Sequence, residues 1–93
     1  MEIEEIKEKI RLNKYELSFH GEKERYAEDI TLSDLETAIS NGEILEDYPN
    51  YPRGPSCLVL GYSQNRPIHI VCGYTPIKWI NERTRAKGGE INA

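Results

Sequence analysis

The chain has few cysteines and no long apolar segment, and both shortages restrict the class of protein. Its 93 residues include two cysteines, Cys57 and Cys72, which are too few for the disulfide framework of a small secreted domain. The longest apolar run, Cys57 to Leu60, is too short to span a bilayer, and the acidic start lacks the apolar core of a secretory signal. We therefore expect a soluble cytoplasmic protein with no membrane partner. Both cysteines should be buried in neighbouring strands, and a nucleophilic thiol is the alternative.

The sequence also lacks the residue spacings that define metal and cofactor sites. The chain has two histidines, His20 and His69, but these and the cysteines form no close pair with the spacing of a zinc site. It contains no glycine-rich phosphate loop, internal repeat or low-complexity linker. We expect neither a metal nor a cofactor. A chain of this length fits one domain over residues 1–93.

Charged residues are unevenly distributed along the chain. The formal net charge is −4 and the isoelectric point is about 5.2, a balance that disfavours a polyanionic partner. Residues 1–46 carry 13 acidic and 6 basic side chains, a net charge of −7, whereas residues 47–93 carry 3 acidic and 6 basic ones, a net charge of +3. The basic half is typical either of a phosphate-facing surface or of ordinary solvated helix faces.

Hydrophobic periodicity and a capping residue predict two helices near the start of the chain. Ile3, Ile6 and Ile10 recur at helical spacing and predict a helix from Glu2 to Leu12. Ser18 has the position of an N-cap for a second helix that ends near residue 29. The side chains of the second helix that we expect to face inward are those of Phe19, Tyr26 and Ala27.

Capping residues and strand-forming runs predict the rest of the fold. Thr31 and Asp34 have the spacing of a capping box for a third helix, which ends at Asn41-Gly42. Strands follow over residues 43–48, 57–62 and 67–74, and the last two are apolar on both faces, as expected of strands covered by helices. Thr75 then caps a C-terminal helix to about residue 87, before a loose tail over 88–93. These elements predict the α+β class, with helices packed on a small antiparallel sheet of about three strands.

A hydroxyl, an imidazole and a guanidinium stand close together at the second predicted helix. Ser18, His20 and Arg25 suit proton transfer near neutral pH and the binding of a phosphate or its charged transition state. On a helix, the spacing separates His20 from Arg25 by about 140°, so a ligand would lie between them. The structural alternative is that Ser18 caps the helix and Arg25 pairs with a nearby glutamate.

Two further features are candidates for binding or catalysis. His69 alternates with isoleucines in an apolar run, so it either completes an acid/base pair with His20 or forms a hydrogen bond as part of the packing. In the proline-bearing loop, Tyr48, Tyr51 and Arg53 either stack on single-stranded nucleic acid or pack within the loop itself.

Several short motifs occur in an order that resembles a known family. They lie within residues 14–74 and are Tyr15-Glu16-Leu17-Ser18-Phe19-His20 with Arg25, Ile30-Thr31, Ala38-Ile39 with Asn41-Gly42-Glu43-Ile44, Cys57-Leu58-Val59-Leu60-Gly61-Tyr62, and Pro67-Ile68-His69-Ile70-Val71. In this ordered set the chain is similar to a prokaryotic domain-of-unknown-function family, family 4258, which is grouped by resemblance with the BrnT and RelE type toxins. The resemblance implies a small α+β fold and metal-independent RNA cleavage.

The same resemblance singles out particular residues and one departure. The positions that match the family pattern are Ser18, His20, Arg25, Glu43 and His69. After His69, the segment Tyr74 to Trp79 follows almost at once, where family members usually have a further strand. The resemblance therefore implies that a hairpin is missing and that part of a substrate-facing surface is absent.

Two functions of different classes follow from these observations. In the first, the domain is an endoribonuclease toxin with RNA as substrate and an antitoxin protein as partner. His20 then removes the ribose 2′-hydroxyl proton, His69 protonates the leaving oxygen and Arg25 stabilises the phosphorane. In the second, the domain is a non-catalytic protein-interaction module in which these side chains hold the helices and the sheet together. The candidate binding residues are Ser18, Glu43 and Arg53.

Overall fold

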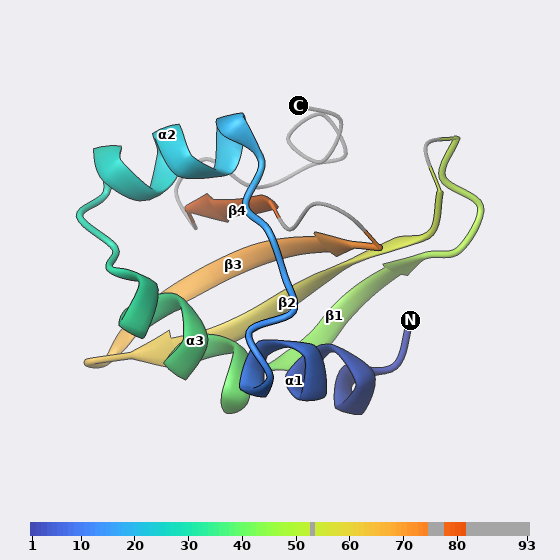
Figure 1. Cartoon of the computed structure of the whole chain (residues 1–93), viewed down its shortest axis with the longest axis horizontal. Coiled ribbons are helices and arrows are strands. Elements are labelled where there is room, and N and C mark those ends of the chain that lie inside the picture. Colours follow the sequence, from blue (N-terminus) through green and yellow to red (C-terminus); the bar gives the residue numbers. More distant parts are fainter. Residues whose placement is uncertain (53, 75–77, 82–93) are drawn as a thin grey trace.

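One layer of helices lies on one antiparallel sheet (Figure 1). The computed structural model describes residues 1–52, 54–74 and 78–81. In chain order the elements are α1 (Ile3–Arg11), α2 (Phe19–Ala27), α3 (Leu32–Ser40), β1 (Glu43–Tyr48), β2 (Ser56–Ser63), β3 (Arg66–Gly73) and β4 (Lys78–Asn81). This arrangement confirms the α+β class predicted from the sequence. None of the helices in the described ranges has both the length and the apolar composition needed to cross a membrane.

Side-chain caps begin two of the helices, as the sequence predicted. The hydroxyl oxygen of Ser18 accepts a hydrogen bond of 2.9 Å from the amide of Gly21, so Ser18 is the N-cap of α2. Thr31 and Asp34 form a reciprocal capping box at the start of α3. Each cap satisfies backbone donors that have no partner within the helix, and this fixes where α2 and α3 begin.

A tight turn sets the register of the two central strands. Gln64 and Asn65 connect β2 to β3 and have left-handed φ angles of 54° and 63°. Two consecutive left-handed residues are the signature of a two-residue hairpin turn whose twist matches that of the flanking strands. The resulting register places Val59 opposite Ile70 and Cys57 opposite Cys72.

The segment after β3 corrects one prediction from the sequence. Residues 78–81, expected to be helical, form the strand β4, which pairs antiparallel with β3. Trp79 and Ile80 belong to residue types that favour strands, and the unpaired edge of β3 offers backbone groups with which they pair. Within the described residues the sheet therefore holds the three predicted strands, β1 to β3, and a fourth, β4, beside β3. The remainder of the predicted C-terminal helix, and the tail, lie outside the described residues.

The main core lies between the sheet and the helices α1 and α3. Ile6 and Ile10 of α1 are buried, as their spacing predicted, and they join one cluster with side chains of α3, β2 and β3. The fully buried large side chains of this cluster are Leu35, Ile39, Val59, Cys57, Ile68, Ile70 and Cys72. The strands approach α3 so closely that a Cβ atom at Gly61 would lie 1.7 Å from the carbonyl oxygen of Ala38. Glycine is therefore required at Gly61 for the two layers to pack.

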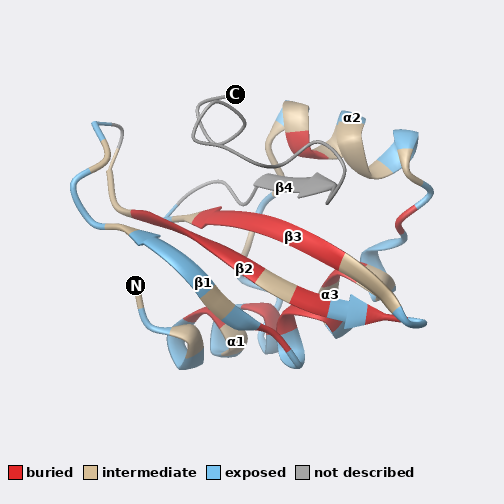
Figure 2. Cartoon of the chain, turned by 180° about the vertical axis from the view of Figure 1, so that it is seen from behind, coloured by how far each residue is buried: buried red, intermediate tan, exposed pale blue. Residues whose placement is uncertain are grey.

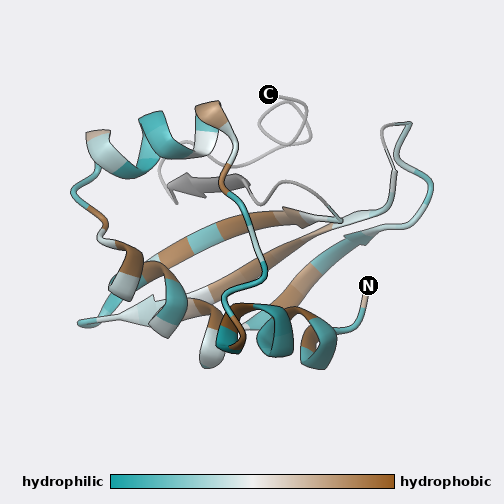
Figure 3. Ribbon diagram, in the orientation of Figure 1, coloured by the Kyte–Doolittle hydropathy of each residue, from teal (hydrophilic) through white to brown (hydrophobic). Residues whose placement is uncertain are grey.

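The described helices cover only one face of the sheet, which corrects the expectation of strands covered on both faces. Seen from behind, most of β2 and β3 is buried although none of the described helices lies over them (Figure 2). Leu58 and Val71 form a small second cluster on this face, against which Tyr48 packs. Apolar residues run along β2 and β3 (Figure 3). Because neighbouring side chains of a strand point to opposite faces, these residues contribute to two separate clusters.

Candidate functional site

Arg25 is held within the protein and does not face an open cleft. Its guanidinium donates hydrogen bonds to Glu22, the shorter at 2.8 Å, and one of 3.0 Å to the carbonyl oxygen of Ile30. Only 11% of the Arg25 side chain is exposed. The hydrogen bond to Glu22 raises the pKa of the guanidinium above its usual range. Arg25 therefore connects the end of α2 to the start of α3, as in the structural alternative drawn from the sequence.

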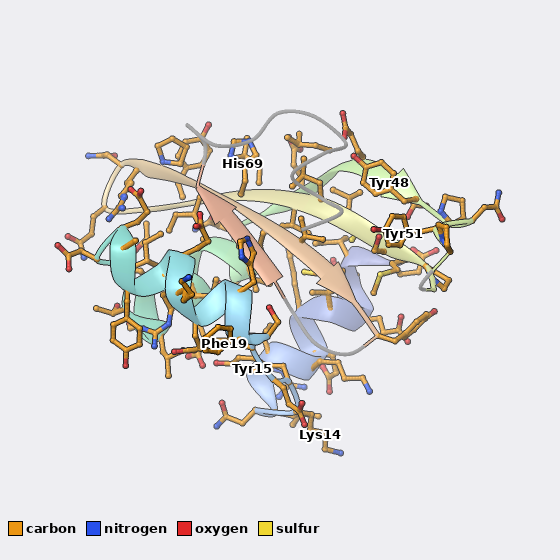
Figure 4. The ribbon with its side chains drawn as sticks, turned by 90° about the horizontal axis from the view of Figure 1, so that it is seen from above. Lys14, Tyr15, Phe19, Tyr48, Tyr51 and His69 are labelled. Carbon is orange, nitrogen blue, oxygen red and sulfur yellow. The ribbon has the colours of Figure 1, made fainter. Side chains whose placement is uncertain are left out.

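The two histidines lie on opposite sides of the sheet. His69 is in β3 between Ile68 and Ile70, whose side chains belong to the core under the helices, so His69 projects from the other face. Figure 4 shows His69 on the side of the sheet away from the helices, and only 6% of it is exposed. His20 is partly buried in the first turn of α2, within the helical layer. The fold does not bring His20, Arg25 and His69 to a common cavity within the described residues.

The remaining predicted binding residues are dispersed as well. Ser18 is engaged as the N-cap of α2, and Glu43 is exposed at the start of the edge strand β1. Tyr48 lies at the end of β1, and its hydroxyl hydrogen-bonds the carboxylate of Glu46. Burial and that hydrogen bond raise the pKa of Tyr48 to about 12. Arg53 lies outside the described residues.

The described residues also form two cavities away from these side chains. The first, of about 490 Å³, is formed by α1, the α1–α2 connection and the end of β3, and it is lined by Lys9, Lys14, Tyr15 and Cys72 among others. The second, of about 590 Å³, lies between α1 and α3. None of the predicted site residues lines either cavity. Within the described ranges no cluster of three or more histidine, cysteine or acidic side chains is placed to hold a metal ion.

An exposed aromatic face on α2 is the feature that sequence reasoning missed. Phe19 and Tyr26, expected to face inward, are 82% and 72% exposed, and Ala27 is exposed too. The buried residue of α2 is Gly21, whose lack of a side chain allows close packing. Phe19, Lys23 and Tyr26 have the spacing i, i+4 and i+7, so they share one exposed helix face. That spacing was the signal in the sequence.

Arg25 also contacts the aromatic ring of Tyr26. Its guanidinium carbon lies 4.8 Å from the centroid of the Tyr26 ring, within the range of a cation–π contact. The same guanidinium is fixed by Glu22 and by the carbonyl of Ile30. The Tyr26 ring is therefore exposed and also held in place, while the apolar residue Leu32 at the start of α3 is 45% exposed.

These features define a small two-layer α+β domain in which Ser18 and Arg25 are engaged in its own structure. The family model described as "Domain of unknown function (DUF4258)" matches residues 17–80, and the chain belongs to this family. The matched region runs from the residue before the α2 cap to β4 and so includes both layers. Comparison with curated proteins gave no match, and comparison with solved structures gave none either.

Proposed function

We propose that this chain is a non-catalytic protein-interaction module with a RelE/BrnT-like architecture, acting in the cytoplasm, and that α2 is its docking surface. The observation that carries the proposal is the exposure of Phe19 and Tyr26 on one face of α2. Aromatic residues are enriched in protein interfaces, where they supply a large apolar area with few rotatable bonds. We define the α2 face as Phe19, Lys23 and Tyr26.

The engagement of the polar residues supports this function over RNA cleavage. Ser18 caps α2, Arg25 joins α2 to Ile30, and His69 is buried on the far side of the sheet. Proton transfer requires an acid and a base that both reach the substrate within hydrogen-bond distance. His20 and His69 project from different layers, so the proposal assigns the family-pattern residues to folding and assigns recognition to the α2 face.

Charge indicates the chemistry of the partner. Residues 1–46, which include the three helices of the described part of the chain, carry a net charge of −7. A surface of this sign repels nucleic acid and attracts basic segments. The partner that fits is a protein whose apolar side chains cover Phe19 and Tyr26 and whose basic residues lie around that contact. An antitoxin protein with such a segment belongs to this class.

Site-specific photo-crosslinking in host cells tests the docking surface. A photoreactive phenylalanine analogue replaces Phe19 in one variant and Tyr62 in a control variant, because Tyr62 is an exposed aromatic residue on β2. We expect a discrete adduct from position 19 that protease destroys and ribonuclease does not, with none from position 62. Adding Tyr26→Ser should remove the adduct, because Tyr26 shares the contact.

Other outcomes contradict the proposal in distinguishable ways. An adduct that ribonuclease destroys identifies RNA as the partner and supports the endoribonuclease hypothesis instead. Equal adducts from positions 19 and 62, or an adduct that survives Tyr26→Ser, show that the α2 face is not the docking surface. Circular dichroism of each variant establishes that the fold is retained in every comparison.

A further inference from the structure

The two cysteines of the chain face each other across the central strands. Cys57 of β2 lies directly opposite Cys72 of β3 in the antiparallel register. Such opposite residues have Cα atoms about 4.5–5.5 Å apart, within the span of about 4.4–6.8 Å that a disulfide bridges. Directly opposite residues of antiparallel strands project from the same face of the sheet, so both thiols lie in the core beneath the helices. The backbone spacing of this pair therefore suits a disulfide.

One of the two thiols borders a cavity. Cys57 and Cys72 are buried in the core beneath the helices, at 0% and 1% exposure. Cys72 nevertheless contributes to the wall of the cavity of about 490 Å³ beside α1. A small uncharged molecule that enters this cavity therefore reaches the wall to which Cys72 contributes, and Cys57 lies beside Cys72 on the neighbouring strand.

The hydrogen bond between the thiols makes their ionisation unequal. Donation from Cys72 to the Cys57 thiolate lowers the pKa of Cys57. The same hydrogen bond and burial raise the pKa of Cys72 well above its usual value. The pair thus loses its first proton more readily than a buried thiol alone, and it keeps the second.

We propose that Cys57 and Cys72 form a reversible oxidative modification site, at which a small hydroperoxide converts the dithiol into a disulfide between β2 and β3. A thiolate of the pair attacks one peroxide oxygen, the O–O bond breaks, and the sulfur becomes a sulfenic acid as the other oxygen leaves as water after protonation. The second thiol then attacks that sulfur, the S–O bond breaks, and a second water leaves. Two thiols and one hydrogen peroxide thus give one disulfide and two waters.

This proposal is independent of the docking surface and has a structural consequence of its own. The disulfide closes the loop that runs from Cys57 through the β2–β3 turn to Cys72. A cross-link of this kind stabilises a protein mainly by restricting the unfolded chain. It also joins the two central strands covalently at the wall of the cavity. In a reducing compartment such a bond is transient, as in redox-sensing proteins.

Mass spectrometry of the purified, fully reduced chain tests the site. After treatment with hydrogen peroxide and alkylation, we expect a loss of about 2 Da from the intact chain and a peptide that links Cys57 to Cys72. The melting temperature should rise by roughly 10–25 °C, and dithiothreitol should reverse both changes. Met1 is the only methionine, and its oxidation adds oxygen, so the two modifications differ in sign of mass change.

Single-cysteine variants provide the matched control. Cys57→Ala and Cys72→Ala keep one sulfur each, so the remaining thiol should stop at sulfenic acid, which dimedone traps, without a rise in melting temperature. If either variant fails to fold, the wild-type measurement still decides. Two free thiols after oxidation, over-oxidation without a linked peptide, or disulfides only between separate chains would each overturn the proposal.

Discussion

Replacing Arg25 by alanine separates the structural role of this residue from a catalytic one. The guanidinium of Arg25 donates a hydrogen bond of 3.0 Å to the carbonyl oxygen of Ile30 and one of 2.8 Å to the carboxylate of Glu22. Its side chain is 11% exposed, so water does not readily replace these contacts. In Arg25→Ala, the carbonyl of Ile30 loses its charged donor, and the link between α2 and α3 is lost.

The magnitude follows from the two kinds of contact. A hydrogen bond to a charged group contributes about 1.5–3 kcal/mol. The Glu22 side chain is 35% exposed, so solvent screens its pairing with Arg25, and we assign this ion pair under about 1 kcal/mol. We expect Arg25→Ala to lower the free energy of unfolding by roughly 2–4 kcal/mol and the melting temperature by roughly 10–25 °C.

Urea denaturation followed by circular dichroism measures this loss. Lys23→Ala is the matched control, because Lys23 is an exposed cation two residues away on the same helix. Its free energy of unfolding should stay within about 0.5 kcal/mol of the wild type. Arg25→Lys should fall between the two, because lysine keeps the charge and loses the planar donor fork. Arg25→Ala with unchanged stability would refute the assignment of Arg25 to folding.

Three further substitutions test other parts of the structure. Gly61→Ala should lower the free energy of unfolding by more than about 3 kcal/mol, because the added Cβ meets the backbone of α3; a melting temperature equal to that of the wild type would contradict this packing. Hydrogen bonds from Ser63 and the Thr31 amide lower the pKa of Asp34. The ionised Asp34 carboxylate therefore stabilises the folded protein above its ordinary pKa of 3.8, and this stabilisation is lost as the pH falls below that value. Stability of Asp34→Asn should therefore depend less on pH between about 5 and 2, and an identical acid dependence would be inconsistent with this role. Burial and the hydrogen bond to Glu36 raise the pKa of Tyr15 to about 12. The neutral Tyr15 hydroxyl therefore stabilises the folded protein below pH 10, and this stabilisation is lost as the pH approaches 12. Ultraviolet titration should show Glu36→Gln ionising a tyrosine earlier than the wild type, and coincident titrations would count against the hydrogen bond.

Elements encoded by nearby residues could be predicted from the sequence. Ser18, Thr31 and Asp34 cap their helices through contacts three residues away, and such contacts depend little on the rest of the fold. The strands β1 to β3 were likewise predicted to within one residue at each end because runs of strand-favouring residues end at turn residues. Local chemistry was sufficient for these elements.

Features that depend on distant pairing could not be predicted in the same way. Residues 78–81 begin just after a capping and proline signal for a helix, yet the free edge of β3 makes them a strand. The prediction that Phe19 and Tyr26 face inward was wrong, because α2 packs through its glycine and leaves its aromatic residues exposed. Both outcomes depend on which surfaces meet, and a single sequence does not contain that information locally.

The candidate site also combines features that the local sequence predicts with features that depend on the folded chain. Arg25 was recognised as a residue of interest, but its acceptor on Ile30 is visible only in the folded chain. His69 was placed on the strand face opposite its isoleucine neighbours, and the structure has those isoleucines in the core beneath the helices. The sequence therefore singled out Ser18 and Arg25, which make contacts within the fold, and left open whether they serve folding or chemistry.

Incubation of the purified full chain with RNA tests the central claim most directly. The wild type, His20→Ala and His69→Ala are compared by electrophoresis of the RNA, with circular dichroism to establish that each chain is folded. A non-catalytic interaction module leaves the RNA intact in all three samples. Cleavage by the wild type that disappears in both histidine variants would contradict the account, because it would require the two side chains to act at one site.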